Sequence, residues 1–214
     1  MFFHGWRSCR RMRICGRYGG PRDLEVHAGY LPVQKPFAHL PLKSEYRPTD
    51  LAPVFVKNRD GDIVIKDMRW WFVPSSFSGP LKDWKATTFN ARLDEVGQKP
   101  TFRKAWDLKR RVIVPASYYN EWTGPAGRKR CWEVGRADGL PIGMAGIWDY
   151  AQTAEGPLLS FAILTRTPGP VMQQLHPREP VVLDSAEWQS WLAGADALPL
   201  AAPWADNAFT VDAA

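Results

Sequence analysis

Short apolar stretches rich in β-branched and aromatic residues, separated by turn residues, dominate this chain from residue 52 onward. Such a pattern predicts extended strands joined by tight turns. The predicted strands cover residues 52–57, 63–66, 68–73, 111–114, 118–122, 131–134, 142–148 and 160–165. The string Asn58-Arg59-Asp60-Gly61 lies between the first two, and Asp-Gly is a strong hairpin signal.

Helical signals are confined to short segments. Residues 100–108 place Phe102 and Trp106 on related faces and end in basic residues, which favour a helix C-terminus. Residues 185–192 are predicted to form a helix with Ser185 as N-cap, and one turn is expected near 23–27. The tail from residue 193 is rich in Ala and Pro and is predicted to be weakly structured. Many strands with few helices predict an α+β fold, a mostly antiparallel, barrel-like sheet with a few peripheral helices.

The chain of 214 residues, 45% of them hydrophobic, suits one domain with a buried core. We expect a basic N-terminal extension over residues 1–14 and a single domain over 15–214. The N-terminus lacks the apolar core of a signal peptide, and no apolar run is long enough to span a membrane. The sequence therefore predicts a cytoplasmic protein that does not bind membranes.

Net charge and aromatic content leave the partner open. The net charge is +6, and basic residues gather in three places: 7–22, 104–111 and 128–130. Each cluster alone fits a solvated face, whereas together they fit a groove for a polyanion. The 11 Trp residues fit either a core of large rings or stacking on nucleic-acid bases.

Metal and cofactor motifs are missing from the sequence. Cys9, Cys15 and Cys131 follow no zinc or disulfide spacing, and the four histidines are scattered. No phosphate-binding glycine loop or Gly-x-Ser-x-Gly string occurs. We expect no metal and no cofactor.

Four strings hold residues with possible chemistry. Cys15 lies in a basic setting that stabilises a thiolate, although on this string alone an inert buried cysteine is the favoured interpretation. Asn90 and Arg92 share one side of an extended segment, where an arginine fork suits a phosphate or a surface ion pair. Glu121 lies among aromatic residues, which suits either a general acid or base, or an exposed strand position. His176 precedes a short strand and fits a proton shuttle or a structural role.

In this order and spacing the strings resemble the SRAP family, the SOS-response-associated peptidases that process abasic sites. The family carries Cys-Gly-Arg, Asn-Ala-Arg-x-Glu, Pro-Ala-x-Gly-aromatic-aromatic-Glu-Trp, Ala-Gly-aliphatic-Trp and His-x-Arg-x-Pro. Here these strings begin at Cys15, Asn90, Pro115, Ala145 and His176. The segment 69–74 also resembles the family's Trp-Gly-aliphatic-aliphatic-Pro, and the match spans roughly residues 15–192.

The resemblance implies an abasic-site sensor of the DNA damage response, monomeric and nucleoid-associated, that binds single-stranded DNA. Its N-terminal cysteine, here Cys15, would form a thiazolidine with the aldehyde of the abasic site. Glu121 would move protons, His176 would help open the sugar, and Asn90 would position the reactants. The resemblance assigns DNA contacts to Arg17, Trp70, Trp71, Phe77, Trp84, Arg92 and Arg178.

Departures from the family pattern keep two alternatives open. Fourteen residues precede Cys15, and a cysteine with Ile14 attached has no free amine. Tyr118 and Trp71 replace glycines, Pro177 replaces an acid, and Asp94 replaces Glu. A non-covalent single-stranded DNA-binding module, or a peptidase that removes its own residues 1–14, therefore remains an alternative.

Overall fold

The computed structural model describes residues 16–125 and 127–214, and most of their regular structure is extended. The strands are β1 (Tyr18–Gly19), β2 (Glu45–Tyr46), β3 (Leu51–Lys57), β4 (Ile63–Trp70), β5 (Asn90–Arg92), β6 (Arg111–Ala116), β7 (Tyr118–Thr123), β8 (Arg130–Arg136), β9 (Ile142–Thr153), β10 (Gly156–Arg166), β11 (Glu179–Pro180), β12 (Val182–Leu183) and β13 (Phe209–Ala213). The α-helices are α1 (Leu24–Ala28), α2 (Pro100–Asp107), α3 (Pro170–Gln173) and α4 (Trp188–Leu192). Short 3₁₀ helices are η1 (Leu81–Asp83), η2 (Ser185–Glu187), η3 (Leu198–Ala201) and η4 (Asp206–Ala208).

Five strands close into a barrel in the order β4, β3, β6, β9 and β10. Neighbours are antiparallel except at the closing pair, where β10 runs parallel to β4 with Phe161 opposite Trp70. Beyond the end of β4, the short strand β5 takes its place beside β10. Closure pairs the edges that an open sheet would expose. The predicted α+β fold with a barrel-like, mostly antiparallel sheet is confirmed.

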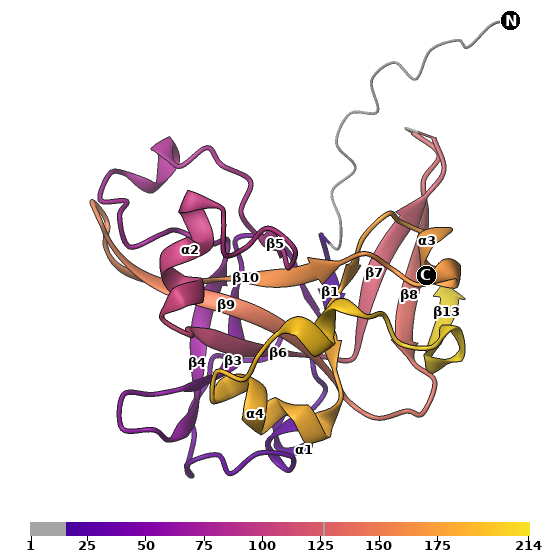
Figure 1. Ribbon diagram of the computed structural model, residues 1–214, viewed down its shortest axis with the longest axis horizontal. Helices are drawn as coiled ribbons and strands as arrows, with labels where there is room; N and C mark the ends of the chain where they lie inside the picture. Colours follow the sequence, from indigo (N-terminus) through magenta and orange to yellow (C-terminus); the bar gives the residue numbers. More distant parts are fainter. Residues whose placement is uncertain (1–15, 126) are drawn as a thin grey trace, which may run out of the picture.

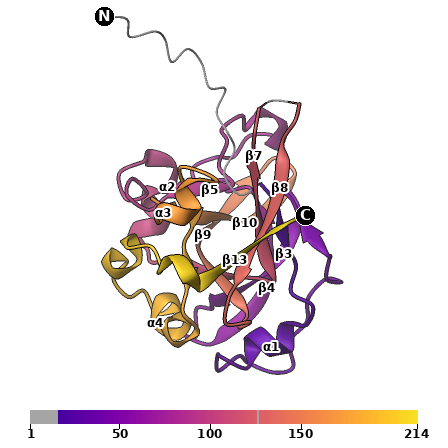
Figure 2. The same cartoon turned by 90° about the vertical axis from the view of Figure 1, so that its right-hand side faces the viewer.

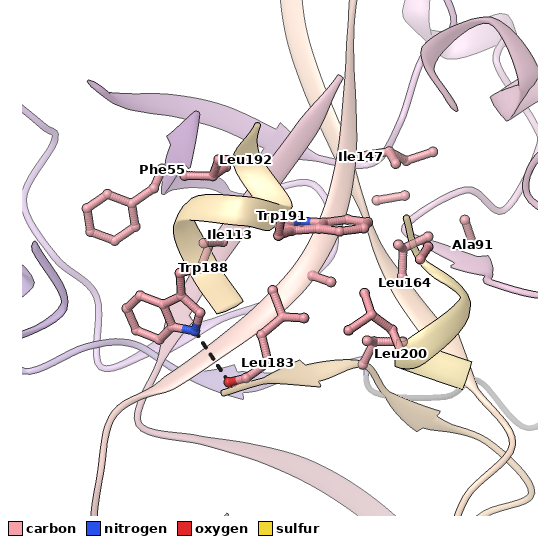
Figure 3. Packing of buried hydrophobic residues seen from close by; sticks show 14 of the residues in the cluster. Phe55, Ala91, Ile113, Ile147, Leu164, Leu183, Trp188, Trp191, Leu192 and Leu200 are labelled. Atoms are coloured by element: carbon pink, nitrogen blue, oxygen red, sulfur yellow. Dashed lines mark hydrogen bonds between the residues drawn. The ribbon is translucent and has the colours of Figure 1, made fainter. Parts of the chain in front are cut away.

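Alternation along the strands divides the apolar residues between the barrel interior and an outer layer. Val112 and Val114 of β6 belong to the inner cluster, whereas Ile113 between them belongs to the outer one. Helices α2 and α4 cover the outer layer. Figure 3 shows Trp188 and Trp191 of α4 within it, with the Trp188 indole donating to the Leu183 carbonyl at 3.3 Å.

A second sheet, in the order β13, β8, β7, β1 and β2, stands beside the barrel. Figures 1 and 2 show β7 and β8 as a long hairpin with β13 along its edge. Only Ser117 separates β6 from β7, so the chain passes directly from barrel to second sheet. Strand β1 pairs with β7, with Tyr18 opposite Tyr119.

Most predicted elements are present, with three corrections. The two strands predicted at 63–66 and 68–73 are one continuous strand, β4, which ends at Trp70. The helix predicted at 185–192 is η2 followed by α4, and its N-cap is Asp184 instead of Ser185. Asp184 and Glu187 form a reciprocal capping box, which satisfies two backbone N–H groups. The tail is better ordered than predicted, because β13 pairs with β8.

Candidate functional site

Glu121 lies on β7 and is 1% exposed. Its neighbours across the sheet are Trp132 on β8 and, on the other side, the segment that leads into β1. The backbone N–H of Asn120 donates to the Arg17 carbonyl at 3.0 Å, which extends the β1–β7 pairing toward Gly16. A buried carboxyl therefore lies on the strand beside the beginning of the described chain. Of the two interpretations of Glu121, the exposed strand position is excluded.

Two glycines allow β1 to approach its neighbours closely. A Cβ at Gly19 would collide with the ring of Tyr118, and one at Gly20 would collide with the Lys43 carbonyl oxygen. Tyr118 stands where the family pattern has glycine, and the missing side chain of Gly19 makes room for its ring. The substitution is thus accommodated without moving β1 away from β7.

Arg17 is held by side chains from three strands. Its guanidinium donates to the Cys131 sulfur at 3.0 Å, forms an ion pair with Glu45 at 3.4 Å, and lies 5.0 Å from the Trp122 ring centroid. Asn120, which is fully buried, also approaches the Cys131 sulfur, at 3.5 Å. Cys131 is therefore a site residue that sequence reasoning missed, because a lone cysteine carries no positional signal.

A row of packed aromatic rings runs from Phe89, the residue before Asn90, to Tyr18 of β1. Phe89, which precedes Asn90, has its ring centroid 5.9 Å from that of Trp70, and Trp70 lies 5.0 Å from Tyr18. Trp70 is completely buried and its indole donates to the Phe89 carbonyl at 2.8 Å. It offers no face to a base, so the DNA contact expected for Trp70 is wrong. The alternation of β4 explains the error, because it turns this position into the barrel.

His176 is 4% exposed and lies between α3 and β11. Its Nδ1 lies 3.2 Å from both the carbonyl oxygen and the backbone nitrogen of Arg178, and Nε2 has no hydrogen-bond partner among the described residues. In the tautomer whose Nδ1–H donates to the Arg178 carbonyl, the basic lone pair is on Nε2. Burial lowers the pKa of His176, and the charge of Lys129 on the β7–β8 hairpin lowers it further. The imidazole is therefore neutral at pH 7 and able to accept a proton.

Arg92 and Arg178 converge on one carboxylate. Arg92 contacts Asp94 at 2.9 Å and Glu95 at 2.7 Å, and Arg178 contacts Asp94 at 2.7 Å. Burial raises the pKa of Asp94, but the Arg178 hydrogen bond and the two arginine charges outweigh it, so the pKa is lowered. Asp94 stands where the family pattern has Glu, and it keeps an acid between the two arginines.

The other aromatic residues with expected DNA contacts are partly exposed. The Trp71 ring packs 5.5 Å from that of Phe89, which places it next to Asn90. Phe77 and Trp84 contact each other at 5.2 Å on the loop between β4 and β5. This loop is tied to the β9–β10 turn, since Leu81 donates to Glu155 and Ala154 donates to Gly79. It therefore stands apart from the β7–β8 hairpin, as Figure 1 shows.

Cys15 and the extension 1–14 lie outside the described residues. Within the described part of the chain, no group of three or more His, Cys, Asp or Glu side chains is arranged to hold a metal ion. No helix in that part is long and apolar enough to cross a membrane.

The chain matches the family described as SOS response associated peptidase (SRAP) over residues 14–212. It is 28% identical over 148 residues to an abasic site processing protein of Saccharomyces cerevisiae, covering 68% of this chain and 38% of that protein. It is 25% identical over 187 residues to the abasic site processing protein YedK of Escherichia coli, covering 84% of this chain and 79% of that protein. A crystal structure of a Bordetella bronchiseptica protein, 25% identical, superposes with a TM-score of 0.81 over 94% of this chain and 99% of that one. The chain belongs to the SRAP family.

Proposed function

We propose that this protein senses abasic sites in single-stranded DNA and crosslinks to them through Cys15. Its membership of the SRAP family and the names of its relatives, which are abasic site processing proteins, support a role in the DNA damage response. The names of the relatives do not specify a covalent crosslink. That part of the proposal is supported by the side chains on β1 and β7.

The observation that carries the proposal is the buried carboxyl of Glu121 beside the segment that follows Cys15. The Asn120 backbone N–H donates to the Arg17 carbonyl, and Asn120 directly precedes Glu121 on β7. Cys15 comes two residues before Arg17 in the sequence. Consecutive Cα atoms are about 3.8 Å apart, so the chain between Arg17 and Cys15 can span no more than about 7.6 Å between Cα atoms. Burial of a carboxyl group costs free energy, so buried acids usually have a partner or take part in proton transfer.

The proposed reaction begins with the open-chain aldehyde of the abasic sugar. The α-amine of Cys15 attacks C1′ to give a carbinolamine. Glu121 donates a proton to its hydroxyl, which leaves as water, and an imine forms. The Cys15 thiol then adds to the imine carbon, and its proton passes to the nitrogen, with Glu121 as the carrier. One thiazolidine ring forms and one water is released.

The remaining side chains receive supporting roles. His176, held neutral by burial, accepts the hydroxyl proton when the closed sugar opens to its aldehyde. Asn90 positions the sugar from the start of β5. Arg17, Arg92 and Arg178 contact phosphates, while Trp71, Phe77 and Trp84 stack on bases or wedge the strand.

The reaction needs a free amine at Cys15. In the printed sequence Ile14 precedes Cys15, so crosslinking by that chain requires hydrolysis of the bond between the two residues. That hydrolysis frees the α-amine of Cys15 and the carboxyl of Ile14, while the side-chain thiol is unchanged. A protein that retains Ile14 would bind DNA without forming the ring.

The test compares the full chain with a chain that starts at Cys15, each mixed with a single-stranded oligonucleotide that carries one abasic site. Intact mass should show an adduct equal to the two masses less one water, formed only by the shorter chain. Glu121→Gln should slow adduct formation by about 10²-fold or more, as loss of a general acid or base does. Glu133→Gln, on the neighbouring strand and opposite Asn120, is the matched control and should leave the rate within about twofold.

Cys15→Ser should form no stable ring. If the chain that starts at Cys15 forms no adduct, the covalent proposal is overturned. Salt-sensitive DNA binding that persists in Cys15→Ala would then identify the non-covalent module as the function.

A further inference from the structure

A basic pocket of about 590 Å³ opens at the end of the barrel where the β3–β4 turn meets the end of α2. Val56, Val64 and Leu159 contribute apolar walls, and Trp148 and Tyr150 of β9 add aromatic ones. Six basic residues also line it: Lys57, Arg59, Lys66, Lys109, Arg110 and Arg111. None of the described residues that line it is acidic. A volume of this size is typical of small-molecule sites, for which about 300–1,000 Å³ is common.

The pocket is separate from the candidate site. None of its lining residues belongs to β1, β5 or β7, and none belongs to the segment around His176. In Figure 1, α2 and the outer ends of β3 and β4 lie on the left, whereas β7 and β8 lie on the right. The pocket takes Lys109, Arg110 and Arg111 from the basic cluster 104–111 and no residue from the cluster 128–130.

Positive charges are crowded at this opening. Arg110 forms an ion pair with the buried carboxyl of Asp149 and lies 5.4 Å from the Trp148 ring centroid. Burial lowers the pKa of Arg110, and repulsion from Arg59 lowers it further. Asp149 thus neutralises one of the six cations, and the pocket keeps an excess of positive charge.

Arg111 is buried without a compensating acid. It is 2% exposed, and none of its three guanidinium nitrogens has a hydrogen-bond partner among the described residues. The guanidinium carbon lies 3.7 Å from the Trp106 ring centroid and 4.8 Å from that of Trp191. Ring faces stabilise a cation but do not satisfy its N–H donors. Trp106 and Trp191 do not line the pocket, so these contacts place the positive charge of Arg111 beside the pocket.

Lys109 is held in a strained backbone conformation beside Arg111. It occupies the left-handed position that ends α2, with φ of 55°, where glycine is usual. Its N–H donates to Trp106 and that of Arg110 to Ala105, so the helix ends in a Schellman motif. A lysine costs about 1–2 kcal/mol more than glycine there. Strain at a lining position is typical of residues kept for binding.

We propose that this pocket binds the phosphate ester of a nucleotide, with the phosphate at the basic rim and the base against Trp148 and Tyr150. Guanidinium and ammonium donors suit phosphate oxygens, and aromatic walls suit a planar base. The ligand chemistry is that of a free nucleoside phosphate or of one nucleotide within a DNA strand.

Two triple variants of the full chain test the pocket. The pocket variant combines Arg59→Gln, Lys66→Gln and Lys109→Gln, all on exposed side chains. The control combines Lys35→Gln, Arg103→Gln and Lys104→Gln, also exposed and outside this pocket. Each variant removes three positive charges, so a nonspecific charge effect would be equal in both.

The probes are deoxyadenosine 5′-monophosphate, measured by calorimetry, and a short fluorescent oligothymidylate, measured by anisotropy at low salt. We expect the pocket variant to weaken binding by about tenfold or more and the control by less than about threefold. Loss of three phosphate contacts should also reduce the salt dependence of oligonucleotide binding by a slope of about 2. The indole ¹⁵N–¹H signal of Trp148, assigned with Trp148→Phe, should shift on binding.

The two probes distinguish the two sources of phosphate. Loss of mononucleotide binding in the pocket variant identifies a free nucleotide as the ligand, and loss of oligonucleotide binding alone identifies a DNA strand. The proposal is overturned if the two triple variants weaken both probes equally, if neither probe binds at low salt, or if the Trp148 signal does not shift.

Discussion

Replacing Arg111 with methionine should stabilise the protein, although the substitution removes a buried side chain's charge and two ring contacts. Burial lowers the pKa of Arg111 to about 10. That decrease corresponds to roughly 3 kcal/mol of unfavourable free energy, at ~1.36 kcal/mol per pKa unit. The rings of Trp106 and Trp191 offset about 1–2 kcal/mol of it. Methionine keeps a long apolar stem, so the free energy of unfolding should rise by about 1–2 kcal/mol.

The pH dependence follows from the direction of the shift. A basic group whose pKa is lowered by folding destabilises the folded state at every pH at which it is charged. The penalty is fully present below the folded pKa of about 10 and is relieved only as pH rises through that value. The stability difference between Arg111→Met and the unaltered protein should therefore be constant between about pH 6 and 9.

Urea unfolding and thermal melting measure the difference, and a rise of about 2–8 °C in Tm is expected for a domain of this size. Arg136→Met is the contrasting variant, because the Arg136 guanidinium donates to Asp138 at 2.9 and 2.5 Å and lies 4.6 Å from the Trp204 ring centroid. It should lose about 1 kcal/mol or more. A loss of stability in Arg111→Met of similar size would refute the reasoning, because it would mean that the folded protein satisfies this guanidinium.

Three further predictions test other parts of the structure. Gly146→Ala should lower the free energy of unfolding by about 1–3 kcal/mol, measured in urea, because its Cβ would lie 2.7 Å from the Ala162 carbonyl oxygen inside the barrel wall. Lys129→Gln should raise the pKa of His176, measured by NMR titration of the imidazole, while burial keeps that pKa below its ordinary value. An unchanged titration would contradict the electrostatic effect of Lys129 on this imidazole. Lys109→Gly should raise the urea midpoint through relief of about 1 kcal/mol of backbone strain, and a lower midpoint would show that packing of the lysine stem is worth more.

Local patterns predicted the elements whose causes are local. The Asp-Gly turn, the capped turn at α1 and the helix α2 each depend on residues within one segment, and all are present. The N-cap of the helical segment 185–192 was misplaced by one residue, because Ser185 and Asp184 are both good caps and only geometry chooses between them. The strand β13 could not be predicted, because its partner β8 lies more than seventy residues earlier in the chain.

The candidate site was predictable as a set of residues but not as a set of contacts. Glu121, Asn90 and His176 stand out through family strings, and the structure adds that Glu121 and His176 are buried. Trp70 shows the limit, since a tryptophan in a motif looks the same whether its ring faces solvent or the barrel. Cys131 shows it too, because only the pairing of β7 with β8 brings its sulfur to Arg17.

Basic residues at the candidate site are paired with acids, whereas most of those at the pocket beside α2 have no acidic partner among the described residues. At the candidate site Arg92 and Arg178 share Asp94, and Arg17 pairs with Glu45, so a phosphate arriving there competes with a carboxylate already in place. Such competition lowers affinity for any phosphate, so in the proposed reaction selection would rest on the aldehyde that only an abasic nucleotide offers. At the pocket beside α2 six basic residues and no acidic one are among the described lining residues, so we expect affinity for phosphate there whatever the base. If the pocket's ligand is a DNA strand, removal of charge at the pocket should weaken DNA association without abolishing the proposed crosslink.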